Sequence, residues 1–224
     1  MWERLAAPWQ ACLEEAWAAY CVGSVPAGAV VVDGEGRIHS RGRNRRRDPR
    51  TGVLPLAGVR LAHAELNALL VLSPAVDPRA CTLYATSEPC PLCVGALAVA
   101  NIRRLHYASR EPWAGGVALL RLTPYLAGKG IAVQGPEDPD LEEAIVAATV
   151  ESFLHGHPTR EGRIVEAYRQ VTPVGVEVGW QLFASGDLRR WRDQGIAAAR
   201  VWTWLGEMVA AARARLAAPA PPRP

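Results

Sequence analysis

Four side chains in two short segments have the types and spacing needed for metal-assisted chemistry. Glu65 follows His63 by two residues, and Cys90 and Cys93 lie three residues apart in a segment that contains two prolines. One imidazole and two thiolates make three protein ligands for Zn²⁺, which prefers four, so one position remains for water. An open position beside an acidic side chain predicts a catalytic zinc ion.

The pair Cys90 and Cys93 has two other interpretations, a closed structural zinc site and a redox-active dithiol. A closed site needs a fourth protein ligand, and a redox pair needs neither His63 nor Glu65. Glu65 alone would be an ordinary glutamate in the first turn of a helix, where the helix dipole favours a negative charge. Its place directly after a metal-binding histidine favours the catalytic interpretation.

Two helix starts are expected to position these side chains. Pro91 and the apolar run at 92–100 predict a helix at 91–101 whose first turn holds the cysteines. Residues three apart share a helix face and the positive end of the dipole favours thiolates, so both sulfur atoms can reach one cation. His63 is expected to open a second helix, which extends to about residue 72 and turns its leucines towards a core.

Residues 28–108 resemble the cytidine deaminase superfamily, especially its branch of tRNA adenosine, guanine and cytosine deaminases. The resemblance rests on the pattern of His63, Glu65, Cys90 and Cys93. It implies that His63, Cys90 and Cys93 bind Zn²⁺ and that Glu65 carries protons. It also implies a hydrolase that acts on C–N bonds of cyclic amidines, replacing an exocyclic amine with a carbonyl and releasing ammonia.

The same resemblance implies substrate contacts by Asn44, Ala64 and Trp113. Asn44 lies in a Gly-Arg-Asn-Arg segment at 42–45, and Trp113 lies in a loop that borders the substrate pocket in related deaminases. An asparagine between glycine and arginines is also typical of a turn, so a structural role for Asn44 stays open.

The remaining elements follow a β-β-α-β-α-β order around the two helix starts. They are a helix at 3–21, a hairpin at 27–40, strands at 82–85, 104–108 and 130–134, and helices at 117–123 and 141–154. Together with the family resemblance they predict an α/β fold. This is a three-layer α-β-α cytidine-deaminase-like domain with a five-stranded mixed sheet and a C-terminal helical extension.

Three segments are predicted along the chain. Residues 1–157 form the zinc-dependent deaminase domain, residues 158–218 form the helical extension, and residues 219–224 form a disordered tail. His155 and His157, near the boundary, are interpreted as residues of a helix end and not as a second metal site. Aromatic residues of the extension could stack on a base, but helical spacing favours packing. They are Tyr168, Trp180, Phe183, Trp191, Trp202 and Trp204.

Composition excludes several classes of protein. The chain of 224 residues is 50% hydrophobic, enough for one sizeable core, yet no apolar stretch approaches the roughly 20 residues that span a bilayer. Five cysteines are an odd number without a disulfide-like pattern, and the start lacks the features of a signal peptide. A cytoplasmic protein without a membrane partner is expected.

The net charge is only +3, but arginines gather before the expected metal site. This arginine cluster comprises Arg41, Arg43, Arg45, Arg46, Arg47 and Arg50. It could hold a phosphate backbone, or it could be a solvated loop paired with Asp48 and the acidic first helix.

These observations favour a zinc-dependent deaminase of a free nucleobase or nucleoside. The chain lacks the aromatic and basic tail of tRNA deaminases, whereas the arginine cluster favours RNA, so tRNA adenosine-to-inosine editing is the alternative. A pterin- or pyrimidine-like biosynthetic intermediate is also compatible with the motif. A non-catalytic binding module of this fold is the third hypothesis, although the intact Glu65 argues against it. The resemblance further implies a homodimer in which a neighbour completes the pocket.

Overall fold

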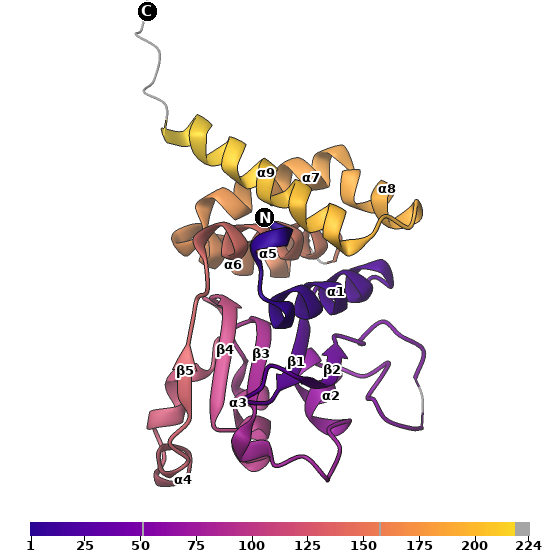
Figure 1. Ribbon diagram of the computed structural model, residues 1–224. Coiled ribbons are helices and arrows are strands. Elements are labelled where there is room, and N and C mark those ends of the chain that lie inside the picture. The colour runs from indigo at the N-terminus through magenta and orange to yellow at the C-terminus, as the bar shows by residue number, and fades with distance from the viewer. Residues whose placement is uncertain (51, 157, 218–224) are drawn as a thin grey trace, which may run out of the picture.

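A five-stranded sheet forms the frame on which the expected site is built (Figure 1). The computed structural model describes residues 1–50, 52–156 and 158–217, so His157 and the predicted tail at 219–224 lie outside the described residues. The strands occur in the spatial order β2-β1-β3-β4-β5. They are β1 (Gly28–Val32), β2 (Ile38–Arg43), β3 (Thr82–Ser87), β4 (Arg104–Ser109) and β5 (Ala132–Gln134).

The strand directions bring two loops to one edge of the sheet. β1 is antiparallel to β2 and β3, which confirms the predicted hairpin, whereas β3, β4 and β5 are mutually parallel. Helix α3 (Pro91–Val99) connects β3 to β4. Because β3 and β4 are parallel, their carboxyl ends lie side by side, and the segments that follow them, 88–93 and 110–116, meet there.

β1 is buried along its whole length because helices cover both faces of the sheet. Ala29 and Val31 belong to the core that lies under α2 (Ala64–Leu70) and α3. Val30 and Val32 belong to the core on the opposite face, where α1 (Ala7–Cys21) and α5 (Pro139–Leu154) pack. Successive side chains of a strand point to opposite faces, so an uninterrupted apolar run serves both cores. Helices on both faces of a mixed five-stranded sheet confirm the predicted fold class.

The C-terminal helices add a further layer beyond α1 and α5, seen at the top of Figure 1. They are α6 (Pro158–Val171), α7 (Pro173–Ser185), α8 (Asp187–Asp193) and α9 (Ala198–Ala217). α5 packs against α6, α7 and α9, and α9 also contacts α1. The extension therefore shares a core with the sheet-bearing part of the chain.

Most aromatic residues of the extension pack within the fold, against one another or against the rest of the chain. Trp202 is 1% exposed, and its indole N–H donates a hydrogen bond to the Leu13 carbonyl at 2.9 Å. Trp191 and Trp204 stack with their ring centroids 4.5 Å apart, whereas Trp180 is 43% exposed. Packing, which the helical spacing favoured, thus accounts for Trp202 and for the Trp191–Trp204 pair.

Short helical segments depart from the prediction at two places. Residues before α1 form a separate 3-10 helix, η1 (Trp2–Arg4), instead of the first turn of one long helix. The predicted helix at 117–123 is a 3-10 helix, η3 (Val117–Arg121), and a further short helix, α4 (Pro124–Gly128), follows it. Proline suits the first position of a helix, so Pro124 opens α4, and a third 3-10 helix, η2 (Pro78–Ala80), precedes β3.

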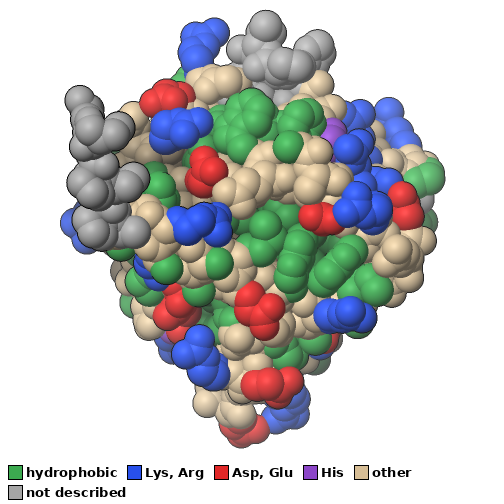
Figure 2. Space-filling view, turned by 90° about the horizontal axis from the view of Figure 1, so that it is seen from above, with side chains coloured by type: hydrophobic (Ala, Val, Ile, Leu, Met, Phe, Trp, Pro, Cys, Tyr) green, Lys and Arg blue, Asp and Glu red, His purple; other side chains and the backbone are tan. Residues whose placement is uncertain are grey.

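The outer face of the extension is mixed in character. Figure 2 shows this face from above, with apolar side chains gathered between basic and acidic ones. Among the described residues, no helix combines the length and the apolar composition needed to cross a membrane.

Candidate active site

The structure brings the three predicted metal ligands into one group at the starts of two helices. His63 immediately precedes α2, Cys90 immediately precedes α3, and Cys93 lies in the first turn of α3. The Nδ1 atom of His63 is 3.6 Å from Sγ of Cys90 and 3.5 Å from Sγ of Cys93, and the sulfur atoms are 3.6 Å apart. Among the described residues, no other group of three or more His, Cys, Asp and Glu side chains could hold a metal ion.

The spacing of these three atoms fits a tetrahedral zinc ion. Zn–S bonds of about 2.3 Å and a Zn–N bond of about 2.0–2.1 Å require ligand separations of roughly 3.6–3.8 Å at tetrahedral angles. The three observed separations, 3.5–3.6 Å, are close to this range. The ligand atoms therefore need little rearrangement to hold the metal.

The pKa of one of the two sulfur atoms also suits a cation. The pKa of Cys90 is lowered to about 4, first by its hydrogen bond with Cys93 and then by its hydrogen bond with His63. The pKa of Cys93 is raised, first by its hydrogen bond to Cys90 and then by burial. The bond to Cys90 raises the pKa of His63. The trio therefore holds a thiolate at Cys90, the form that binds zinc.

Glu65 lies on α2 beside the metal ligands. Its side chain is buried and interacts with the sulfur of Cys93. Burial is the main effect on its pKa and raises it, while the positive charge of His63 acts in the opposite direction. The carboxyl group is thus held out of bulk water next to the expected metal position, where it can exchange protons with a bound molecule.

A glycine in β2 allows α2 to approach the sheet closely. A Cβ atom at Gly42 would lie 2.3 Å from the carbonyl oxygen of Ala64 and 2.3 Å from the nitrogen of Ala68. The amide of Asn67, also on α2, donates hydrogen bonds to the carbonyls of Arg43 and Leu56. These contacts hold α2 against the strand that leads to Asn44.

Asn44 both stabilises a turn and faces the predicted site, the two roles that its sequence context left open. Its side-chain oxygen accepts a hydrogen bond from the backbone N–H of Arg46 at 3.2 Å, as in a turn. Asn44 is also buried and lines the same cavity as His63 and Glu65. The turn therefore presents the asparagine at the predicted site.

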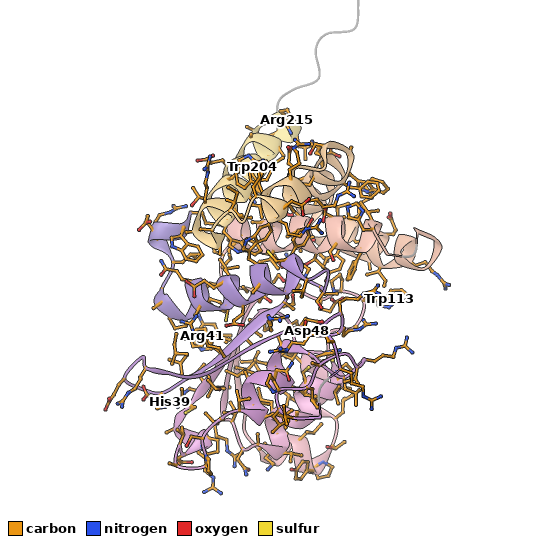
Figure 3. The ribbon with its side chains drawn as sticks, turned by 90° about the vertical axis from the view of Figure 1, so that its right-hand side faces the viewer. His39, Arg41, Asp48, Trp113, Trp204 and Arg215 are labelled. Atoms are coloured by element: carbon orange, nitrogen blue, oxygen red, sulfur yellow. The ribbon has the colours of Figure 1, made fainter. Side chains whose placement is uncertain are left out.

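A cavity of about 700 Å³ opens above the metal ligands. All three predicted substrate contacts, Asn44, Ala64 and Trp113, line it together with His63, Glu65 and Cys90. Trp113 is 54% exposed, and Figure 3 shows it at the level between the helices of the extension and the sheet.

Much of the cavity wall comes from residues that the sequence did not single out as site residues. They are Val25, Ala27, Arg60, Ser87, Glu88, Glu111, Ala114, Thr149, Phe153, Gly156 and Ile164. Two others, His155 and Tyr168, had been interpreted only as a helix end and as a packing residue. Several of these residues lie on α5 and α6, far along the chain from the motif, and no local pattern marks them as neighbours of the metal site.

His155 ends α5, as predicted, but it also lines the cavity. It is the C-terminal cap residue of the helix, and its Nε2 atom lies 2.9 Å from a carboxylate oxygen of the fully buried Glu151. Its ring also lies against Phe183, with centroids 4.6 Å apart. His155 therefore ends α5 and also forms part of the cavity wall.

The arginine cluster is divided between internal ion pairs and the cavity. Arg43 makes a two-pronged contact with Asp48 at 2.8 and 2.6 Å, and Arg45 contacts the same carboxylate at 3.0 Å. Arg41 pairs with Glu14 on α1 at 2.7 Å; Figure 3 labels Arg41 and Asp48. The predicted pairing with Asp48 and the first helix is thus present for three arginines.

The other part of the cluster faces the expected site. Arg46 and Arg47 line the cavity, and Arg60 from the same long loop joins them. These residues give one side of the cavity a basic character, whereas Trp113, Phe153 and Ile164 give it apolar surface.

The fold and the site together define a class of protein. A His-x-Glu segment together with a Pro-Cys-x-x-Cys segment is the signature of zinc-dependent base deaminases, and here the two segments lie at two helix starts beside a mixed five-stranded sheet. Residues 4–109 match the family model described as the cytidine and deoxycytidylate deaminase zinc-binding region. Residues 4–109 are therefore similar to the zinc-binding region of this deaminase family, and their His63, Cys90 and Cys93 side chains are positioned for a metal ion.

Similar proteins differ in what their names say they act on. A tRNA(Ile)-lysidine synthase of Deinococcus deserti is 40% identical over 95 residues, which are 42% of this chain and 16% of that protein. A tRNA-specific adenosine deaminase of Agrobacterium fabrum is 36% identical over 96 residues, 42% of this chain and 57% of that protein. The structure of a guanine deaminase from Nitrosomonas europaea is 25% identical, with a TM-score of 0.50, and the likeness covers 66% of this chain and 85% of that one. The chain thus spans 16% of the length of the Deinococcus deserti protein and 57% of the length of the Agrobacterium fabrum protein.

Proposed function

We propose that this protein is a zinc-dependent hydrolytic deaminase whose substrate is a free nucleobase or nucleoside. The observation that carries the proposal is the single cavity that joins the His63, Cys90 and Cys93 group to Glu65 and Asn44. An acid–base side chain beside an open metal position, under a cavity, matches the requirements of hydrolysis at a ring carbon.

The roles of the residues follow from their places in the cavity. His63, Cys90 and Cys93 would hold Zn²⁺, which when bound supplies Lewis acidity that activates water near neutral pH. Glu65 would take a proton from that water, deliver it to the ring nitrogen next to the amine, and then help ammonia to leave. The ring carbon gains the water oxygen as a carbonyl while the C–N bond breaks.

The remaining cavity residues would orient the substrate. Asn44 would donate or accept hydrogen bonds at the base or sugar, and Trp113 would stack against the ring. The cavity volume of about 700 Å³ lies within the range of about 300–1,000 Å³ typical of small-molecule sites. The likeness to a guanine deaminase covers 66% of this chain, a larger share than residues 4–109 make up. This likeness is consistent with a small free substrate.

Editing of tRNA is the second candidate, and a different observation favours it. Arg46, Arg47 and Arg60 lie at the cavity, where they could contact phosphates. The relative from Agrobacterium fabrum is named as a tRNA-specific adenosine deaminase. Against this candidate, Arg43 and Arg45 are already paired with Asp48, which reduces the positive charge available to RNA.

The deciding experiment is ammonia release by zinc-loaded protein from a panel of substrates. The panel contains cytosine, adenine and guanine, their nucleosides, and a tRNA anticodon stem-loop, with Glu65→Gln as the inactive control. Release from a base or nucleoside would support the proposed function. Release from the stem-loop alone, with binding that weakens steeply as salt rises, would replace it with tRNA editing. No release from any of them would favour the non-catalytic binding module.

Two further features stay predictions. Assembly as a homodimer, with a neighbour completing the pocket, is checked by light scattering after size-exclusion chromatography. The division into a deaminase domain at 1–157 and an extension at 158–218 is checked by whether the two parts unfold in separate transitions.

A further inference from the structure

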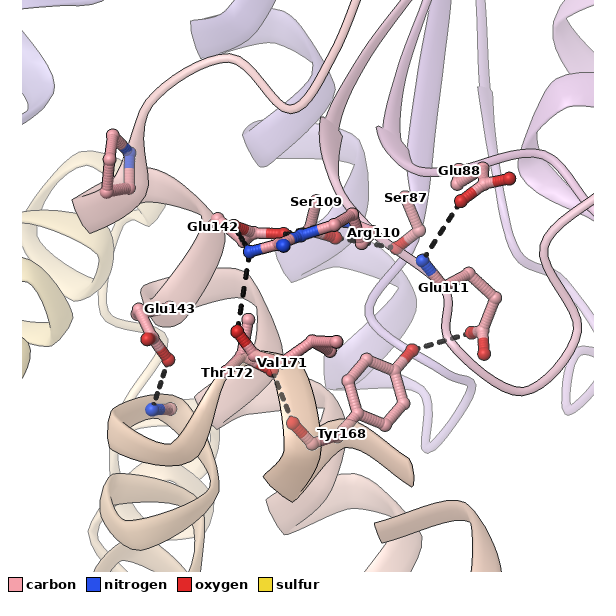
Figure 4. Close-up of polar contacts among 12 residues, drawn as sticks. Ser87, Glu88, Ser109, Arg110, Glu111, Glu142, Glu143, Tyr168, Val171 and Thr172 are labelled. Carbon is pink, nitrogen blue, oxygen red and sulfur yellow. Dashed lines mark hydrogen bonds and ion pairs between the residues drawn. The ribbon is translucent and has the colours of Figure 1, made fainter. Parts of the chain in front are cut away.

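Tyr168, on α6 of the extension, makes a buried contact with the loop that carries Trp113 (Figure 4). Its side chain is 1% exposed, and its hydroxyl donates a hydrogen bond of 2.6 Å to Oε2 of Glu111. The other carboxylate oxygen of Glu111 accepts hydrogen bonds from the backbone N–H groups of Trp113 and Ala114, at 3.1 and 3.2 Å. One carboxylate thus joins the extension to the turn at 111–114.

The same turn is fastened on its other side to the segment that supplies Cys90. The Glu88 carboxylate accepts hydrogen bonds from the backbone N–H of Glu111 at 3.5 Å and of Val117 at 3.2 Å. The N–H of Gly116 donates to the Pro89 carbonyl at 2.8 Å. A Cβ atom at Gly116 would lie 2.6 Å from the nitrogen of Pro91, so only glycine permits this close approach.

A second link holds the start of the loop to the helices above it. The Arg110 guanidinium pairs with Glu142 of α5, with both contacts at 2.8 Å. The same guanidinium donates to the carbonyl of Val171, at the end of α6, at 3.3 Å. This end of α6 is therefore fixed without Tyr168, and the Tyr168 hydroxyl acts on the tip of the loop. Burial, followed by the negative charge of Glu111, keeps the pKa of Tyr168 well above its usual value, so its hydroxyl stays a donor.

We infer that Tyr168 is a positioning and specificity-determining residue. Through Glu111 it holds the Trp113 turn as one wall of the cavity, so the range of substrates is set partly by a helix outside residues 4–109. The specificity part of this inference rests on the proposed deaminase function, whereas the positioning part rests on the hydrogen bonds alone.

Removal of one oxygen atom tests the inference with little change in packing. Tyr168→Phe keeps the buried ring but leaves Glu111 without its hydroxyl donor. The turn then loses a charge-assisted hydrogen bond, of a kind that stabilises by more than a neutral one. Tyr125→Phe is the matched control, because it removes the same atom from a residue on α4 that is 56% exposed and does not line the cavity.

The first readout is hydrogen exchange of the backbone amides of Trp113 and Ala114, measured by mass spectrometry on peptides covering 110–117. In Tyr168→Phe we expect these amides to exchange about tenfold faster, while exchange in α3 and the zinc content stay unchanged. Unchanged exchange at 110–117 would overturn the inference, whether or not the protein deaminates anything.

The second readout is the ratio of kcat/KM for a base to that for its nucleoside, taken from the substrate panel. We expect Tyr168→Phe to shift this ratio by about tenfold, because a displaced wall changes how substrates of different size are oriented. An equal loss for every substrate would reduce Tyr168 to a stabilising residue. Faster exchange without activity on any panel member would leave the positioning role intact and remove the proposed function.

A double-mutant cycle identifies the partner through which Tyr168 acts. If the hydroxyl works through Glu111, the effects of Tyr168→Phe and Glu111→Gln on exchange are not additive. Additive effects would mean that Tyr168 acts by another route, against the inference.

Discussion

Glu65 lies beside the metal ligands but does not belong to the group that could bind the ion. Its buried carboxyl group lies beside the metal group, where the proposed function gives it proton transfer, whereas His63 and the two cysteines form the group that could bind the ion. A substitution of Glu65 should therefore lower turnover without loss of zinc, whereas a substitution of a metal ligand should lower the zinc content.

Glu65→Gln should abolish most activity while leaving zinc in place. The amide has nearly the same shape but cannot carry a proton, and loss of a positioned acid–base group lowers rates by about 10²–10⁴ or more. Turnover and zinc content are measured on the same preparation. Glu35→Gln, the same change on an exposed turn, should alter neither. Near-normal turnover by Glu65→Gln would remove Glu65 from the mechanism.

Cys93→Ser should lose the metal. A serine hydroxyl stays protonated where a thiolate is needed, so zinc content should fall from about one ion per chain to a small fraction of that. Metal analysis after desalting gives the value. Cys81→Ser, a change at an equally buried cysteine outside the metal group, should keep full zinc content. Retention of zinc by Cys93→Ser would contradict the ligand assignment.

At the scale of elements, the site depends on how closely α2 lies to β2. His63 reaches the cavity from the position just before α2 and Glu65 from its first turn, and the absence of a side chain at Gly42 lets that helix sit directly on the strand. The cysteines depend in the same way on the start of α3.

Gly42→Ala should destabilise the protein and impair the site. Its Cβ would lie 2.3 Å from backbone atoms of Ala64 and Ala68, so α2 or β2 must move. Overpacking of this kind typically costs about 1–3 kcal/mol of unfolding free energy. Urea denaturation gives that quantity. Gly34→Ala, in the hairpin turn with open space around it, is the control; an equally small effect at both positions would contradict the close approach.

At the scale of the whole molecule, the extension and the sheet share one apolar core. Residues of α1, β1, α5, α7 and α9 belong to the same buried cluster, and Trp202 links α9 to the Leu13 carbonyl of α1. Figure 1 shows α9 lying across the helices that cover the sheet.

Trp202→Ala should lower the unfolding free energy by about 3–5 kcal/mol, because it removes a fully buried aromatic side chain together with its hydrogen bond. Trp180→Ala, at a position that is 43% exposed, should lower it by less than about 1 kcal/mol. Both are measured by urea denaturation. A small effect at Trp202 would mean that α9 contributes little to the shared core.

Local patterns were sufficient for the metal group and the sheet. The spacing of His63, Cys90 and Cys93 predicted one cation, and the strands and the hairpin followed from apolar runs bounded by turns. The cysteine pair and the hairpin depend on contacts between residues that are close in sequence. The meeting of His63 with Cys90, 27 residues away, was implied by the family resemblance instead. The pairing of Arg43 with Asp48, five residues apart, was within reach of the same reasoning.

The sequence by itself thus determined the group that could bind zinc, the candidate acid–base residue and the fold class. Only the tertiary structure decided what encloses the cavity. The contact of Tyr168 with Glu111 joins residues 57 positions apart, and Phe153 and Ile164 reach the cavity from α5 and α6. No periodicity encodes which helix surface will cover which loop, because that choice depends on the packing of the whole core. The motif predicts which residues could carry the chemistry, whereas the shape of the cavity depends on packing between residues far apart in the sequence.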